Sequence, residues 1–119
     1  MCGETLSFES NSMAKNPNIP GQISDYQQTA IEIVASLVPK KGRMVEVGSL
    51  FGSSSWCWAK SVDPSATVYC VDPWENNVGI WAMEKRCGIK YGIDQFKVYT
   101  ADCPNIVPKQ GYSPNDFED

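Results

Sequence analysis

The chain contains no histidine, and this absence excludes Ser-His-Asp triads and histidine-based metal sites among these residues. Cations are also few, since 10 Lys and Arg stand against 14 Asp and Glu and the net charge is −4. Their one cluster, Lys40, Lys41 and Arg43, is smaller than the basic stripe that nucleic-acid binding requires. We interpret the cluster as a solvated turn and expect no nucleic-acid partner.

Long apolar runs are missing as well. No run approaches the roughly 20 residues that a membrane span needs, and no charged start leads into a signal-type core. The cysteines are odd in number and form no CxxC pair; they are Cys2, Cys57, Cys70, Cys87 and Cys103. We therefore expect no membrane association and a cytoplasmic location.

What the chain does contain is enough for one globular domain. Its 119 residues, 42% of them hydrophobic, can bury a single core. Residues 1–23 show no sustained hydrophobic period and are expected to be irregular. Residues 24–119 are expected to form the domain.

Helices and strands are predicted to alternate along this domain. A capping box, Ser24-x-x-Gln27, starts the first helix, which Pro39 and Gly42 end. Its apolar face is predicted to be Tyr26, Ala30, Ile31, Val34 and Leu37. The first strand follows at 43–47. The next helix begins near residue 53, with serines as its N-caps.

The second strand is predicted at 66–72, after a turn at 63–65. A helix over 80–90 and a third strand over 95–102 complete the pattern, and the proline-containing remainder is expected to be a loop. This βαβ rhythm predicts an α/β fold, a Rossmann-like parallel sheet of three strands with helices on both faces.

Acidic residues fall where these strands end, which is where open α/β sheets bind ligands. Glu46 and Gly48 lie at the end of the first strand, Asp72 ends the second and Asp102 ends the third. Asp72 lies 24 residues beyond Gly48, close to the ~20-residue offset at which an acid reaches a ribose. We predict that its carboxylate accepts hydrogen bonds from ribose hydroxyls.

The glycine spacing narrows the choice of nucleotide. A dinucleotide fingerprint would place glycines where this chain has Leu50 and Ser53, and no Gly-Lys-Ser/Thr of a phosphate-binding loop follows Gly48. What remains is E-x-G-x-x-x-G, formed by Glu46, Gly48 and Gly52. Its acid would repel a phosphate.

These motifs resemble a known family. "VEVGSLFGSSS" followed by "VYCVDPW" is similar to motifs I and II of class I S-adenosylmethionine-dependent methyltransferases. The small-molecule O-methyltransferase-like branch writes its first motif V-E-[IV]-G-S-x-x-G-x-S. The upstream "IPGQISDYQQTAIEIVASLVP" also resembles the helix that precedes this motif in the branch. The resemblance covers about residues 20–110.

The resemblance implies how the methionine end of S-adenosylmethionine would be held. Gly48 and Gly52 would line it, and Glu46 would lie near its ammonium group. Ser49 and Ser53 belong to the same cofactor-binding turn.

The adenosine end would be held by the later strand ends. By resemblance, Asp72 would hold the ribose and Trp74 would pack beside the adenine, while Asp102 and Cys103 would flank its amino edge. No catalytic residue and no metal ligand is implied.

The chain also departs from the family. The family sheet has seven strands in the order 3-2-1-4-5-7-6, and this sequence stops at Asp119, about where the fourth would begin. We therefore expect a truncated, cofactor-binding portion of a methyltransferase whose small-molecule acceptor is unknown. The first strand would then be an exposed apolar edge, so we expect a homodimer joined through residues 43–47.

Other interpretations stay open. Glu46 can be a solvent-facing residue of an edge strand, Asp72 can cap the turn that follows it, and an aspartate such as Asp102 is common after strands. The whole chain can be a non-catalytic Rossmann-like assembly module or an NAD-type nucleotide-binding domain. Cys2, exposed by methionine removal, would suggest an N-terminal-nucleophile amidotransferase.

Overall fold

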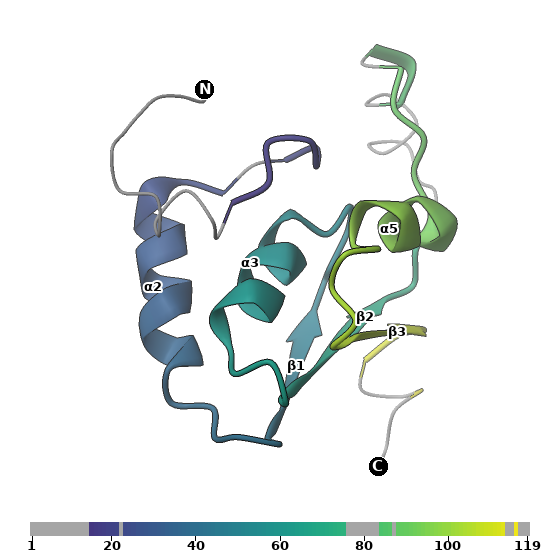
Figure 1. Ribbon diagram of the computed structural model, residues 1–119. Coiled ribbons are helices and arrows are strands. Elements are labelled where there is room, and N and C mark those ends of the chain that lie inside the picture. Colours follow the sequence, from purple (N-terminus) through teal and green to yellow (C-terminus); the bar gives the residue numbers. More distant parts are fainter. Residues whose placement is uncertain (1–14, 22, 76–83, 87, 114–115, 117–119) are drawn as a thin grey trace.

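The computed structural model describes residues 15–21, 23–75, 84–86, 88–113 and 116. Its helices are α2 (Asp25–Ala35), α3 (Ser53–Ser61) and α5 (Ile93–Tyr99), and its strands are β1 (Arg43–Val47), β2 (Thr67–Asp72) and β3 (Ile106–Gln110) (Figure 1). The strands are parallel and lie in the order β1-β2-β3. The fold is therefore the predicted α/β fold, a small Rossmann-like sheet of three parallel strands.

Helix α2 begins as predicted. Ser24 is its N-cap, and its hydroxyl accepts a hydrogen bond from the backbone N–H of Gln27 at 3.1 Å. The Gln27 side-chain oxygen accepts in turn from the Ser24 N–H at 2.9 Å. The helix ends at Ala35, earlier than the predicted stop at Pro39.

The predicted apolar face of α2 is confirmed at Ile31 and wrong at its other four positions, which are exposed. The helix buries Gln28, Ile31 and Ala35, while Tyr26 and Leu37 of the predicted face are exposed. The polar Gln28 can take a buried position because its amide donates to Glu32 at 2.9 Å. The buried side of α2 therefore includes a polar residue, which a pattern of apolar residues alone does not identify.

The first two strands confirm their predictions. β1 has the predicted bounds, and β2 starts one residue later than predicted. Between α3 and β2, the carboxylate of Asp63 accepts the N–H of Ser65 at 2.9 Å, which forms the predicted turn.

The predicted third strand, 95–102, is wrong, because most of it is helix α5. The segment alternates apolar and polar residues, but the structure buries Phe96 and Thr100, which are four residues apart and share a helical face. Val98 would share a face with Phe96 in a strand; instead its exposed fraction is 64%.

The third strand is β3, which lies in the region predicted to be a loop. Pro108 made a strand improbable there, since proline lacks the N–H that a central strand needs. β3 pairs only with β2 among the described residues, so Pro108 sits on an edge strand, where the missing donor is tolerated.

Most of the predicted helix over 80–90 lies outside the described residues, which omit 76–83 and 87. Within the part that is described, residues 84–86 are helical and residues 88–90 are not. The helix over this range therefore stays a prediction.

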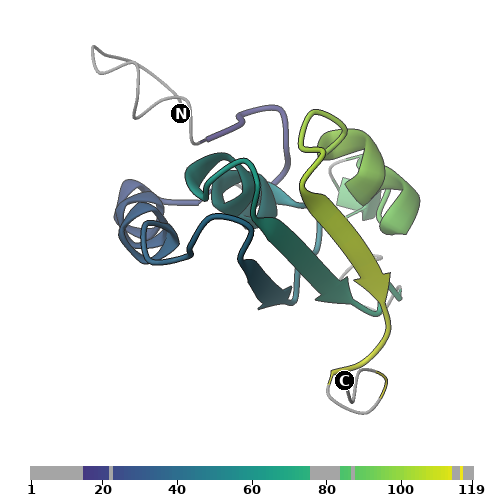
Figure 2. The same cartoon turned by 60° about the horizontal axis from the view of Figure 1, so that its bottom comes forward.

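The described helices lie over one face of the sheet, not over both as predicted (Figure 2). Val68 of β2 packs in one core with Trp56 of α3 and Phe96 of α5. On the opposite face Val45 and Val47 are 61% and 64% exposed. The reason is topological: each strand is followed by its neighbour in the same direction, so right-handed crossovers carry α3 and α5 to the same side.

The N-terminal segment also contributes to the core. Residues 15–21 form no helix or strand, as expected, yet the side chain of Ile19 is buried in the main cluster. Within the described ranges, no helix is both long enough and apolar enough to cross a membrane.

The helical assignment of α5 can be tested by two alanine substitutions. Phe96→Ala should lower the free energy of unfolding by about 3–5 kcal/mol, because it empties a fully buried site. Val98→Ala should change it by less than about 0.5 kcal/mol, because Val98 faces solvent. Urea denaturation measures both; large and equal losses would indicate a strand that buries both side chains.

Candidate functional site

The turn between β1 and α3 contains three residues in the left-handed backbone region. They are Gly48, Leu50 and Gly52, with φ of 85°, 51° and 103°. The Gly48 N–H donates to Val71 at 2.7 Å and so continues the β1–β2 ladder. A left-handed Leu50 costs about 1–2 kcal/mol, so other contacts must hold this turn in place.

Glu46 holds the turn from the β1 side. Its Oε1 accepts hydrogen bonds from the hydroxyls of Ser49, at 2.9 Å, and Ser55, and its Oε2 accepts one from Ser54. Glu46 is half-buried, so the interpretation that it is merely a solvent-facing edge residue is wrong. Its carboxylate instead lies against the first turn of α3, where negative charge is favourable.

The serines therefore do not cap α3 as predicted. The N-cap is Gly52, which has no side chain to offer, and Ser54 and Ser55 turn their hydroxyls to Glu46. Ser53, from the predicted cofactor set, is the first helical residue and is half-buried.

Asp72 holds the same turn from the β2 side, and its exposed fraction is 4%. Its Oδ2 accepts from the N–H of Leu50 at 3.1 Å, and its Oδ1 accepts from the N–H of Trp74 at 2.7 Å. The Tyr91 hydroxyl donates to Oδ1 as well, at 3.0 Å. Asp72 thus does cap the turn that follows it, as one interpretation of the sequence proposed.

The two carboxylates accept hydrogen bonds from consecutive residues of the turn. Glu46 accepts from the Ser49 hydroxyl, and Asp72 accepts from the Leu50 N–H. A carboxylate offers about four acceptor positions, and described residues occupy three of them in each case. Counted over the described residues alone, about one acceptor position on each acid has no hydrogen-bond donor. The structure therefore brings Glu46, Gly48 and Asp72 together at adjacent strand ends, as the sequence predicted.

The two glycines of the motif differ in their surroundings. A Cβ at Gly48 would meet no heavy atom within 4 Å, so the backbone there faces open space. A Cβ at Gly52 would lie 2.9 Å from the Thr100 methyl and 3.1 Å from the Phe96 ring. Gly48 is open to a ligand, whereas Gly52 is required for the close approach of α5.

Trp74 lies mainly in the core. The residue is 5% exposed, its ring packs on Phe96 with 4.9 Å between ring centroids, and its Nε1–H donates to the carbonyl of Leu50 at 2.7 Å. These contacts give the ring a structural role, and its predicted place beside an adenine stays a prediction.

Asp102 and Cys103 are not at the predicted end of the third strand. They follow α5 and precede β3, whereas Asp72 pairs with Gln110 at the far end of β3. Asp102 accepts the Nε1–H of Trp56 at 3.0 Å and lies beside Lys60. The prediction that Asp102 and Cys103 lie at a carboxyl strand end assumed a strand over 95–102. Because that segment is mostly helix α5, this prediction is wrong as well.

The three cysteines in the described part of the chain, Cys57, Cys70 and Cys103, are free and buried. Burial raises the pKa of Cys103 to about 12 and the pKa of Cys57 and of Cys70 to about 11. Such thiols are protonated at neutral pH and are poor nucleophiles. Within the described part of the chain, no group of three or more His, Cys, Asp or Glu side chains is placed to hold a metal ion.

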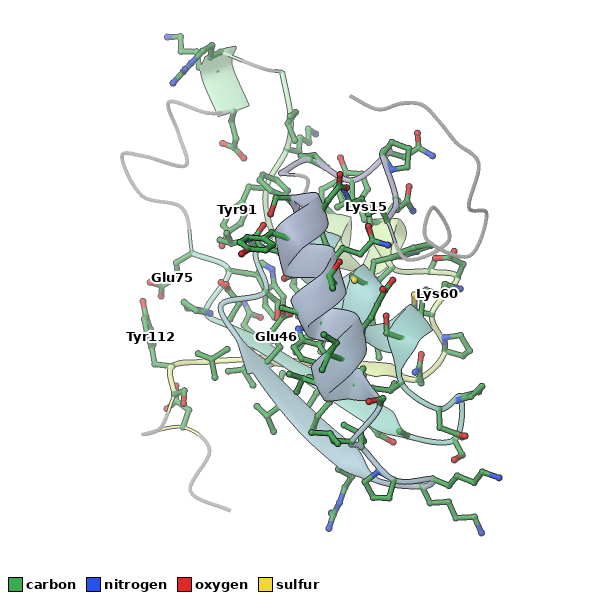
Figure 3. All side chains as sticks on the ribbon, turned by 90° about the vertical axis from the view of Figure 1, so that its left-hand side faces the viewer. Lys15, Glu46, Lys60, Glu75, Tyr91 and Tyr112 are labelled. Carbon is green, nitrogen blue, oxygen red and sulfur yellow. The ribbon has the colours of Figure 1, made fainter. Side chains whose placement is uncertain are left out.

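Further contacts that close this end of the sheet have no counterpart among the sequence predictions. Tyr91 reaches Asp72 from a position 19 residues away, and the Tyr112 hydroxyl donates to Glu75 (Figure 3). The amide of Gln110 donates to the carbonyl of Pro73 at 3.0 Å. These partners carry no motif, so only the fold reveals them.

Comparison with models of known protein families finds no match to this chain, and comparison with curated protein sequences finds none either.

The difference between the glycines predicts unequal effects of alanine. Gly52→Ala should lower the free energy of unfolding by roughly 2–4 kcal/mol, because left-handed strain adds to a clash with α5. Gly48→Ala should cost only the strain, about 1–2 kcal/mol. Chemical denaturation of both variants checks this, and equal losses would contradict the packing role of Gly52.

Proposed function

We propose that this chain binds S-adenosylmethionine at the carboxyl ends of β1 and β2, as the cofactor-binding part of a methyltransferase. One observation carries the proposal: Gly48 is left-handed, faces open space and lies in a turn that two carboxylates hold. A ligand that approaches this backbone meets two anionic groups. Such a place suits a cationic ligand with hydroxyls and repels a phosphate.

S-Adenosylmethionine has the groups that these acids would recognise. Its ammonium group would take the remaining position on Glu46, and its ribose hydroxyls would bond Asp72. Hydrogen bonds to charged groups contribute about 1.5–3 kcal/mol each. Gly48, with no side chain, would let the methionine portion lie against the backbone.

The reaction proposed is transfer of the sulfonium methyl to a nucleophilic atom of a small-molecule acceptor. The C–S bond breaks as the new bond forms, and the demethylated product, S-adenosylhomocysteine, remains. Catalysis would come mainly from positioning the two reactants. We assign no catalytic residue in this chain.

We also propose a cytoplasmic location. The thiols of Cys57, Cys70 and Cys103 are free, which fits a reducing compartment.

An assembly module without chemistry is the second candidate. It is favoured by the internal satisfaction of the site, since protein groups already occupy most acceptor positions of Glu46 and Asp72. An NAD-type domain has less support, because a dinucleotide would bring its pyrophosphate to a turn flanked by these acids.

Two glycines with matched geometry test cofactor binding. Gly48 and Gly21 have φ of 85° and 81°, and a Cβ at either would meet nothing within 4 Å. Alanine should therefore strain the fold equally at both, but only Gly48→Ala should obstruct the ligand. We expect S-adenosylhomocysteine to bind Gly21→Ala as it binds the wild type, and Gly48→Ala at least about tenfold more weakly, a loss of about 1.4 kcal/mol.

Isothermal titration calorimetry gives these affinities. Equal affinities of the two variants would indicate that the ligand binds somewhere other than the turn at Gly48. No binding to wild-type protein would favour the assembly module.

The open edge of β1 is the basis of a proposed homodimer. Among the described residues β1 pairs with β2 alone, through even-numbered positions such as Gly42 and Gly48. Alternate residues of a parallel strand bond to opposite sides, so the backbone groups of the odd-numbered residues face outward. An antiparallel pair of two β1 strands can therefore be centred on Val45. The opposite edge, β3, instead carries Pro108 and Lys109, which discourage pairing.

A charge on this edge should dissociate the dimer. Val45→Lys should reduce the mass measured by light scattering from dimer to monomer, because it places like charges opposite each other at the two-fold axis. Val98→Lys, at a position of similar exposure on α5, should leave the dimer intact. A wild-type protein that is monomeric across a concentration series would refute this assembly.

A further inference from the structure

Tyr91 contacts the acid to which the ribose is assigned. Its hydroxyl donates to Oδ1 of Asp72 at 3.0 Å, and its ring packs edge-on against Phe51 with centroids 5.4 Å apart. Its backbone N–H donates to the carboxylate of Glu84 at 2.8 Å. Figure 3 shows Tyr91 on the side of the molecule where Glu75 and Tyr112 also lie.

The three donors on Asp72 are not equivalent. Those of Leu50 and Trp74 are backbone groups, and the two residues are tied together because the Trp74 ring N–H donates to the Leu50 carbonyl. Withdrawing either would dismantle the turns. Tyr91 donates through a side-chain hydroxyl, which leaves by rotation about its side-chain bonds. Tyr91 is therefore the exchangeable partner of Asp72.

The acceptor positions on Oδ1 and Oδ2 of Asp72 determine which ligands must displace the Tyr91 hydroxyl. Oδ1 accepts both Trp74 and Tyr91 and is full, whereas Oδ2 accepts only Leu50 among the described residues. A ligand with one hydroxyl can use the position left on Oδ2. A ribose whose two hydroxyls donate one to each carboxylate oxygen needs an acceptor position on Oδ1 as well as on Oδ2.

We propose that the Tyr91 hydroxyl is an internal substitute for a ribose hydroxyl and must leave Asp72 before a ligand with a vicinal diol can bind in full. This inference rests on the proposed function, since it assumes that a ribose reaches Asp72. Tyr91 is thus a specificity-determining residue: it holds the empty site in order and penalises entry by diol ligands.

The state of the hydroxyl agrees with this role. Burial, together with the negative charge of Asp72, raises the pKa of Tyr91 above its usual value. The hydroxyl is therefore a proton donor at neutral pH.

The test compares Tyr91→Phe with a matched control. Tyr91→Phe removes the competing hydroxyl and keeps the ring on Phe51. S-Adenosylhomocysteine should therefore bind this variant about tenfold more tightly than the wild type, a gain of about 1.4 kcal/mol in binding free energy. Tyr99→Phe is the control, because the Tyr99 ring also packs on Phe51, at 6.5 Å. The Tyr99→Phe variant should bind S-adenosylhomocysteine with wild-type affinity. The gain of Tyr91→Phe should disappear with the 2′-deoxy analogue, which needs no position on Oδ1.

The outcomes separate the two proposals. If wild type binds S-adenosylhomocysteine and Tyr91→Phe binds it equally or more weakly, the substitute role of Tyr91 is overturned while the proposed function stands. If wild type shows no binding, the proposed function fails and this inference fails with it.

A second measurement uses the wild-type protein and does not depend on how the variant folds. The ring carbon that bears the Tyr91 hydroxyl should shift in NMR spectra of ¹³C-tyrosine-labelled protein at saturating S-adenosylhomocysteine, because its hydrogen bond is lost. An unchanged Tyr91 resonance, with ligand bound, would overturn the inference.

Discussion

The buried carboxylate of Asp72 determines the shape of this end of the sheet. It accepts the N–H groups of Leu50 and Trp74, two non-glycine residues in the left-handed region, from the turns that follow β1 and β2. Each such residue is disfavoured by about 1–2 kcal/mol, and the hydrogen bonds to a charged acceptor offset that cost. Because one side chain holds both turns, the ends of two strands keep a fixed relation to each other.

The proposed site uses the same acids that stabilise the fold. Glu46 binds the serines at the start of α3, and Asp72 binds the turns, so both are oriented before any ligand arrives. Such preorganisation lowers the entropic cost of binding. It also means that replacing Asp72 would disturb the fold as well as the affinity, which makes Gly48 and Tyr91 the more informative positions.

The sequence predicts those features that depend on neighbouring residues. The capping box at Ser24, strand β1 and the placing of Glu46 and Asp72 at strand ends all rest on local patterns. The short run 95–102 fits both a helix and a strand from its pattern alone, and in the folded chain Phe96 and Thr100 are buried on one helical face. The contact of Tyr91 with Asp72 and the position of the described helices over one face of the sheet likewise arise from the path of the chain between elements.

The most direct test of the central claim is a titration of ¹⁵N-labelled protein with S-adenosylhomocysteine, followed by amide NMR spectra. If the turns that Asp72 holds form the cofactor site, the amides of Gly48, Leu50 and Trp74 should shift at saturation, while those of α2 stay in place. Shifts confined to another part of the molecule, or none at all, would contradict the account.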